Sequence, residues 1–220
     1  WSTSTRPTCV RRAGVEPELT IAIDPLVPTG PLINSLRALS ETFPNLPVHF
    51  STEGLGGSLR RLRDGSAAFA LCLLLPGVPE DIAAYPLLRV SMRAVVSPGH
   101  PLALLGRPAT EGDLAPHIQL VLSDPVDPGG ASYGLAGTRH WRFVDLGRRF
   151  DFLLAGFGWC RMPEHLVATS IVAEALTAIE IHDDPTPPEG LKIYAAHRRD
   201  RALGVAGRWL RDELRRSLVS

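Results

Sequence analysis

The chain has 220 residues, enough for one large domain or two small ones, with 45% hydrophobic and 21% charged residues. This composition excludes an intrinsically disordered chain, and no run of about 18 uncharged apolar residues is present that would cross a membrane. The 23 basic residues balance 23 acidic ones, which argues against nucleic-acid binding by this chain on its own.

Cysteine usage and the N-terminal composition favour a reducing compartment. Cys9, Cys72 and Cys160 are widely spaced and form no C-x-x-C pair, so neither a disulfide framework nor a zinc site is indicated. Residues 1–12 are polar and lack the apolar core of a secretory signal, so we expect a cytoplasmic protein unless a signal was removed upstream. Residues 1–16 show no periodicity, and we interpret them as a tail or a hinge remnant.

Strand and helix patterns alternate along the first part of the chain. Apolar residues at every second position predict a strand at 19–23, and Thr29 is a plausible N-cap for a helix with apolar residues at helical spacing. A second strand is expected at 48–51, a second helix at 54–63, and a strand buried on both faces at 67–75. This order predicts parallel strands joined by right-handed crossovers in an α/β sheet.

A second α/β unit follows. Thr110 is expected to cap a short helix, and residues 123–137 are rich in Pro and Gly and predict a loop. The remaining elements expected are strands at 85–88, 93–96, 118–122, 141–144, 156–160, 178–181 and 191–196, and helices at 110–114, 146–155, 163–169 and 205–218.

Two segments of the first unit suggest ligand contacts. In parallel α/β sheets, ligands bind beyond the carboxyl ends of the strands. Residues 24–30 and 51–57 follow predicted strands and lead into helix N-termini, where free N–H groups and the helix dipole favour an anion. The glycine-rich stretch 54–58 lacks the last glycine of a dinucleotide fingerprint and a Walker lysine, so we expect no nucleotide cofactor; a plain tight turn is the alternative.

Catalytic and metal-binding patterns are weak. Residues 130–134 match G-x-S-x-G around Ser132, but they lie inside a loop and not between a strand and a helix, where that nucleophile motif belongs. No two of the seven histidines stand three or four residues apart, as metal ligands on a helix would. The arginine excess after His197 fits a solvated helix face better than a nucleic-acid contact. We therefore expect no enzyme, no cofactor and no metal centre.

Five segments, taken together and in order, resemble the effector-binding domain of LysR-type transcriptional regulators. The resemblance extends over about residues 17–218. The segments that carry it are LTIAIDPLVPTGPLINSLRALSETFPNLPVHFSTEG near the start, LRRLRDGSAAFAL after it, VVSPGHPLA at 95–103, AGFGWCRMPEHLV at 155–167, and IYAAHRRDRALGVAGRWLRDELR at the end.

The resemblance implies a type II periplasmic-binding-protein-like α/β fold, in which two α/β subdomains are joined by two crossover strands. By position, the crossovers match residues 95–98 and 189–195. Subdomain I would comprise residues 17–97 plus 192–220, and subdomain II residues 98–191.

The resemblance further implies a small-molecule effector in the cleft between the subdomains, held by helix N-termini and by loops at strand ends. Leu55 stands where many relatives carry a hydroxyl, and Glu53 would repel an anion; both argue against a simple aromatic acid as the effector. By position, the expected effector-binding residues are Pro28, Thr29, Gly30, Glu53, Gly54, Leu55, Ser97, Pro98, Ser123, Asp124, Gly158, Trp159 and Cys160.

Homodimers or homotetramers, with protomers side by side and antiparallel, are also implied by the resemblance. Members of the family begin with a winged helix-turn-helix, and nothing before residue 17 resembles one, so we expect DNA contact only through a domain absent from this chain. A solute-binding protein of a transport system has the same fold and is the alternative. A signal sequence upstream would favour transport, and a helix-turn-helix would favour regulation.

Overall fold

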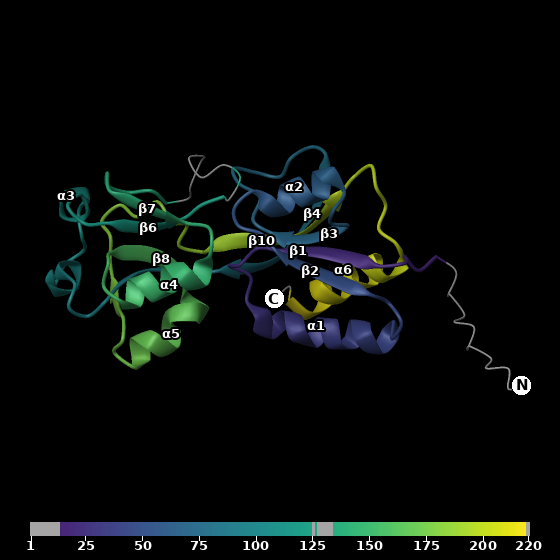
Figure 1. The fold of residues 1–220 in the computed structure, drawn as a ribbon, viewed down its shortest axis with the longest axis horizontal. Coiled ribbons are helices and arrows are strands. Elements are labelled where there is room, and N and C mark those ends of the chain that lie inside the picture. The colour runs from purple at the N-terminus through teal and green to yellow at the C-terminus, as the bar shows by residue number, and fades with distance from the viewer. Residues whose placement is uncertain (1–13, 125, 127–133, 219–220) are drawn as a thin grey trace, which may run out of the picture.

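The computed structural model describes residues 14–124, 126 and 134–218. The chain forms two lobes, each built on a five-stranded sheet with helices packed against it (Figure 1). This arrangement confirms the prediction of an α/β protein with two subdomains.

The first subdomain holds the first four strands, the last strand and three helices. Its elements are β1 (Leu19–Ile23), α1 (Thr29–Thr42), β2 (Val48–Thr52), α2 (Gly57–Asp64), β3 (Phe69–Cys72), β4 (Ile82–Val90), β10 (Leu191–Arg198) and α6 (Val205–Leu218). The strand order is β2-β1-β3-β10-β4. β1 pairs in parallel with β2 and β3, as the strand–helix–strand pattern predicted, and β10 runs antiparallel to its neighbours.

Alternation along the strands divides the core of the first subdomain into two layers. Leu19 and Ile21 of β1 and Phe69 of β3 belong to the layer under α1 and α6, whereas Ala22 and Ala70 belong to the layer under α2. Successive side chains of a strand point to opposite faces, so one strand contributes to both layers. Figure 1 shows α1 and α6 side by side on one face of the sheet and α2 on the other.

The second subdomain has the strand order β7-β6-β8-β5-β9. Its elements are β5 (Met92–Val96), a 3-10 turn (Pro101–Leu104), α3 (Glu111–Leu114), β6 (Gln119–Leu122), β7 (His140–Phe143), α4 (Leu146–Leu154), β8 (Trp159–Pro163), α5 (Glu164–Val172) and β9 (Thr177–Ile179). Thr110 caps α3 as predicted. Its hydroxyl accepts from the Asp113 N–H at 3.3 Å, and the Asp113 carboxylate accepts from the Thr110 N–H at 2.8 Å.

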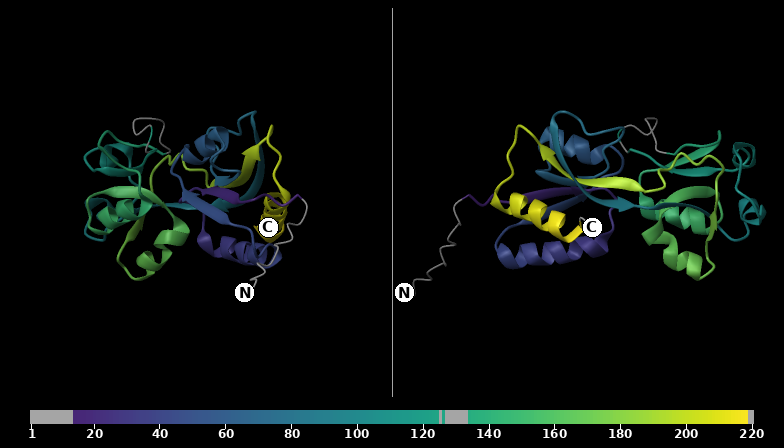
Figure 2. Two further views of the ribbon diagram at one scale, coloured as in Figure 1. Left: turned by 45° about the vertical axis from the view of Figure 1, so that its right-hand side comes forward. Right: turned by 180° about the vertical axis from the view of Figure 1, so that it is seen from behind.

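The chain passes between the sheets twice, at neighbouring places that form the hinge. β4 runs into β5 through Ser91, and the chain returns through residues 180–190 into β10, which Figure 2 shows from behind. The first passage comes earlier than the expected 95–98. The physical reason is pairing: β5 bonds to β8 and β9 of the second sheet, so residues 92–96 belong to the second subdomain and not to the first.

Residues 14–16 differ from the expected tail because they are part of the first subdomain. The Glu16 carboxylate accepts hydrogen bonds from the N–H groups of Ala206 at 3.0 Å and Gly207 at 2.7 Å. A Cβ on Gly204 would overlap this carboxylate, and Val15 packs on the core. Glu16 therefore caps α6, where the first N–H groups of the helix have no partner within it.

Candidate ligand-binding cleft

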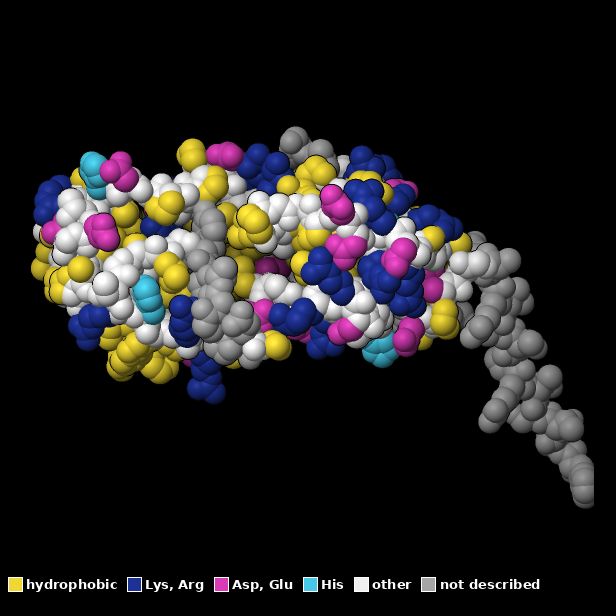
Figure 3. All heavy atoms as spheres, turned by 90° about the horizontal axis from the view of Figure 1, so that it is seen from above, with side chains coloured by type: hydrophobic (Ala, Val, Ile, Leu, Met, Phe, Trp, Pro, Cys, Tyr) yellow, Lys and Arg dark blue, Asp and Glu magenta, His cyan; other side chains and the backbone are white. Residues whose placement is uncertain are grey.

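A cleft of about 510 Å³, counting the part open to solvent, lies between the two subdomains. Figure 3 shows the surface hollowed between the two lobes. The cleft is lined by Leu26, Leu55, Leu73, Leu75, Met92, Gln119, Leu120, Val121, Leu122, Gly134, Arg149, Arg161 and Leu191.

The inner part of this cleft is apolar. Leu26 follows β1, Leu122 ends β6 and Leu191 begins β10, and the three buried side chains form one cluster. The cluster thus joins the two subdomains next to the hinge. Apolar walls of this kind favour the hydrocarbon part of an organic ligand.

Arg149 brings a charge into this apolar surrounding. It lies on α4 and is only 5% exposed. Its Nη2 donates to the Arg161 carbonyl at 3.0 Å and lies 2.9 Å from Sδ of Met162, while its buried Nε has no hydrogen-bond partner among the described residues. Burial lowers the pKa of Arg149, yet a guanidinium keeps its proton in proteins.

Arg161, in the middle of β8, is by contrast paired. Its Nε lies 3.2 Å from Oδ1 of Asp184, its Nη1 donates to the Gly134 carbonyl at 2.5 Å, and its guanidinium carbon stands 5.4 Å from the ring centre of Trp159. Burial works to raise the pKa of Asp184, but hydrogen bonds from Thr186 and Arg161 outweigh it and lower that pKa. This ion pair ties β8 to residues 180–190 of the hinge.

An ion pair also bridges the cleft. Asp124 follows β6 in the second subdomain and accepts two hydrogen bonds from Arg60 of α2 in the first, one of them 2.7 Å long between Nη2 and Oδ1. The carboxylate lies against the start of α2, since a Cβ on Gly56 would stand 2.9 Å from its Oδ2. Asp124 therefore lies beside the helix N-terminus that the sequence marked as favourable for an external anion, although the N-cap of α2 has no side-chain hydrogen bond.

Glu53 and Leu55 also play different parts from those expected. The Glu53 carboxylate is paired with Arg61 of the same subdomain, so its charge is neutralised and the expected repulsion of an anion loses its basis. Leu55 lines the cleft. α2 begins at Gly57, with Gly56 as its left-handed N-cap, and not at residue 54, so Gly54 and Leu55 precede the helix.

The expected residues at the start of α1 lie outside the cleft lining. Pro28 is the N-cap, without a side-chain hydrogen bond, in place of the expected Thr29. Thr29 and Gly30 are the first helical residues and are exposed. Their part in effector binding stays a prediction.

Ser97, Pro98 and Ser123 stand near strand ends but not in the cleft lining. β5 meets the cleft at its first residue, Met92, whereas Ser97 and Pro98 follow its other end. Ser123 is buried at the end of β6, and its hydroxyl donates to the Phe143 carbonyl at 3.3 Å.

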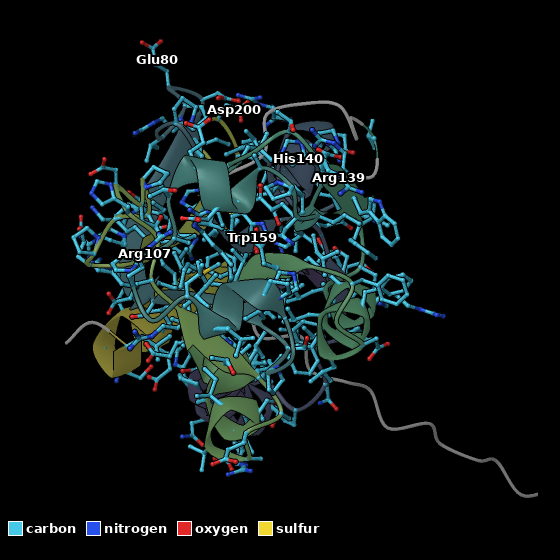
Figure 4. All side chains as sticks on the ribbon, turned by 90° about the vertical axis from the view of Figure 1, so that its left-hand side faces the viewer. Glu80, Arg107, Arg139, His140, Trp159 and Asp200 are labelled. Carbon is cyan, nitrogen blue, oxygen red and sulfur yellow. The ribbon has the colours of Figure 1, made fainter. Side chains whose placement is uncertain are left out.

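Gly158, Trp159 and Cys160 are not in the cleft lining, although Trp159 pairs with Gln119, which is. The strand begins at Trp159, later than the expected 156–160, and a Cβ on Gly158 would overlap the carbonyl of Ile118. Trp159 is fully buried inside the second subdomain (Figure 4), as is Cys160. The residue of β8 that reaches the cleft is the next one, Arg161.

Sequence reasoning missed Arg149 and Arg161, although a signal was present. Arg149 shares its buried helix face with Leu153, four residues on, and Arg161 stands in a strand that is buried throughout. Arginine at a core position is rare unless it is paired, so this pattern marks a functional or structural ion site.

Other groups considered from the sequence show no sign of chemistry. Burial raises the pKa of Cys72 to about 12 and that of Cys160 to about 11, so both thiols are protonated. Cys9 and Ser132 lie outside the described residues. In the part of the chain that the structure describes, no group of His, Cys, Asp and Glu could hold a metal, and no helix has the length and apolar character of a membrane span.

The comparison with known families is decisive for identity. The LysR substrate-binding domain family matches residues 12–219. The chain belongs to this family. It is a ligand-sensing regulatory domain with the type II periplasmic-binding-protein-like fold, as the resemblance implied, which favours the regulator over the transport alternative. No curated protein sequence matches the chain significantly.

Solved structures of this family share the fold. The regulatory domain of MetR from N. meningitidis, in a form with two cysteines replaced, is 17% identical with a TM-score of 0.68, over 91% of this chain and 93% of that one. The effector-binding domain of QuiR in complex with shikimate is 14% identical with a TM-score of 0.68, over 90% and 95%. The BenM effector-binding domain with its effector benzoate is 19% identical with a TM-score of 0.63, over 92% of each chain.

Proposed function

We propose that this LysR-type domain binds a small-molecule effector in the cleft between its subdomains and that binding changes how the subdomains are placed. The observation that carries the proposal is the cleft itself. Its lining includes Leu55 from the first subdomain, Leu122 from the second and Leu191 at the start of β10, next to the hinge. A ligand there would touch both subdomains at once.

The hinge and the bridging ion pair support a two-state response. The subdomains are joined through Ser91 and residues 180–190, and Arg60 and Asp124 meet across the cleft. A ligand that contacts both walls binds the closed arrangement more tightly than an open one, and this difference in affinity shifts the equilibrium. The shikimate and benzoate complexes of QuiR and BenM are consistent with a small organic effector.

We further propose a cytoplasmic, non-enzymatic homodimer or homotetramer that acts on DNA through a separate domain of the regulator. Exposed aromatic side chains on two edge strands support association of protomers: Phe50 on β2 and Trp141 on β7. Trp141 continues into a surface cluster with Phe152 and Phe157, whose ring centres lie 6.3 and 5.5 Å from its own. Edge strands with exposed apolar residues are typical association surfaces.

A metabolite library screened by thermal unfolding tests effector binding. A ligand at 100 times its Kd adds about 2.7 kcal/mol and should raise the Tm of a chain of this size by about 5–10 °C. Leu55→Trp would fill the cleft and abolish the shift, whereas Val172→Trp, at a position 85% exposed on α5, would leave it unchanged. A hit that stabilises Leu55→Trp as well as the wild type would contradict binding in the cleft. Sedimentation at high concentration should show dimers or tetramers, and a monomer would contradict the assembly.

A further inference from the structure

Two arginines line the cleft, but among the described residues only one of them has a carboxylate that neutralises its charge. Arg149 and Arg161 both line the cleft, and Arg161 has the Asp184 carboxylate as its partner. No ion pair involves Arg149 among the described residues. Cys160 is the titratable group whose charge would act on the pKa of Arg149. Burial raises the pKa of its thiol to about 11, so the thiol is protonated and does not serve as a counter-ion.

Arg149 is held in place but not satisfied. The Arg161 carbonyl and the Met162 sulfur orient its Nη2, while Nε is buried without a hydrogen-bond partner in the described parts of the chain. An uncompensated buried charge and an unpaired buried donor both disfavour the folded state. A residue that served packing alone would be an apolar one at this position of α4, beside Leu153 on the same face.

Two other anion-favouring helix starts have a carboxylate of the protein beside them, and the start of α1, which has no side-chain cap, lies outside the cleft lining. Asp124 lies against the start of α2, and Glu16 accepts hydrogen bonds from the first N–H groups of α6. Nη2 of Arg161 also has no hydrogen bond among the described residues, but Arg161 is paired with Asp184, so the guanidinium without a carboxylate partner among the described lining residues is that of Arg149.

We infer that Arg149 receives the acidic group of the effector, and that the effector is an organic monoanion whose apolar body packs on the leucines of the cleft. This inference rests on the proposed effector cleft and names the ligand class that it takes. A single negative charge balances the single unneutralised guanidinium, and the cluster of Leu26, Leu122 and Leu191 supplies the apolar surface. Glu53 and Leu55 no longer argue against a simple acid as the effector, because the anion binds at Arg149 on the wall formed by the second subdomain, opposite to them.

Matched pairs of probes test the charge requirement. Cyclohexanecarboxylate and hexanoate would be titrated at millimolar concentration against their uncharged amides, with thermal unfolding and calorimetry as readouts. We expect the carboxylates to raise the Tm of the wild type and the amides to have little effect. Arg149→Met should weaken carboxylate binding by about 10- to 100-fold, the range for a lost charge-assisted hydrogen bond. Arg148→Met is the matched control, since Arg148 is the exposed neighbour on the same helix, and it should bind as the wild type does.

Ligand-free unfolding of the same variants separates a receptor from a structural residue. If Arg149 is a ligand-binding charge without a partner in the ligand-free protein, Arg149→Met should melt at or above the wild-type Tm. If Arg149 belongs to a structural ion site, the same substitution should clearly lower the Tm. Equal stabilisation by carboxylates and amides, full carboxylate binding by Arg149→Met, no response to any carboxylate, or a large loss of Tm in Arg149→Met would each overturn the inference. Binding of uncharged library compounds that Leu55→Trp blocks would leave the proposed function standing while the anion inference fails.

Discussion

The ion pair between Arg60 and Asp124 is the contact by which charge holds the two sides of the cleft together. Its two hydrogen bonds are charge-assisted, and bonds of that kind contribute roughly 1.5–3 kcal/mol when shielded from water. The Arg60 side chain is 39% exposed and that of Asp124 13%, so solvent screening reduces the contribution. We expect a coupling free energy of about 1 kcal/mol, at the upper end of the range for exposed pairs.

A double-mutant cycle measures this coupling. The wild type, Arg60→Gln, Asp124→Asn and the double variant would be unfolded in urea, because the cycle removes the contributions of the other contacts of each residue. The matched control is the pair of Arg63 and Asp81, which also forms two hydrogen bonds, of 2.8 and 2.9 Å, but lies within the first subdomain with both side chains about half exposed.

The control pair should give a coupling below about 0.5 kcal/mol and lose it at high salt. Asp124→Asn should also enlarge the radius of gyration in X-ray scattering, because the cleft opens, whereas Asp81→Asn should not. A coupling for Arg60 and Asp124 no larger than that of the control pair, with unchanged scattering, would refute the role of this contact in closing the cleft.

Three further predictions concern the folded state. Glu16→Gln should destabilise the domain by about 0.5–2 kcal/mol in urea unfolding, because a charged cap of α6 is lost. Burial raises the pKa of Asp24 to about 7. The protonated carboxyl therefore favours the folded state, and this stabilisation is lost as the pH rises from about 4 through about 7. Over that interval the free energy of unfolding of Asp24→Asn should increase by up to about 4 kcal/mol relative to that of the wild type. In a Cys9→Ser variant, Cys72 and Cys160 should not react with dithionitrobenzoate at pH 8 until the chain unfolds, because burial raises the pKa of both thiols.

Each of these three has an outcome that contradicts it. Glu18→Gln, at an exposed position beside His49, is the control for the cap, and an equal effect of the two substitutions would count against capping. A stability difference for Asp24→Asn that stays constant between pH 4 and pH 8 would show that the carboxyl does not titrate with folding. Rapid modification of either buried thiol in the native state would show that the cores around them open easily.

The fold could be predicted from the sequence where local pattern and tertiary packing agree. The terminal helix was expected at residues 205–218 and is found there, because its buried Leu210 and Leu214 share one face and nothing interrupts it. The first strand and the first helix follow the expected pattern for the same reason. The parallel pairing of the first three strands followed from the crossover rule.

The features that could not be predicted from the sequence depend on contacts between residues far apart in the chain. Glu16 caps a helix whose first turn lies 190 residues later, so no local pattern shows that it is part of the fold. The strand of residues 92–96 is assigned to a sheet by its partners β8 and β9, and not by its own composition. Arg149 was overlooked because its place on the cleft wall depends on how α4 packs on β8.

A crystal structure of the domain with a bound carboxylate that raises its Tm would show where and how the effector is held. We expect the ligand between the subdomains, with a carboxylate oxygen within hydrogen-bond distance of the Arg149 guanidinium and its apolar part on Leu26 and Leu122. A ligand bound outside the cleft, or bound in it with its carboxylate turned away from Arg149, would contradict effector binding by Arg149.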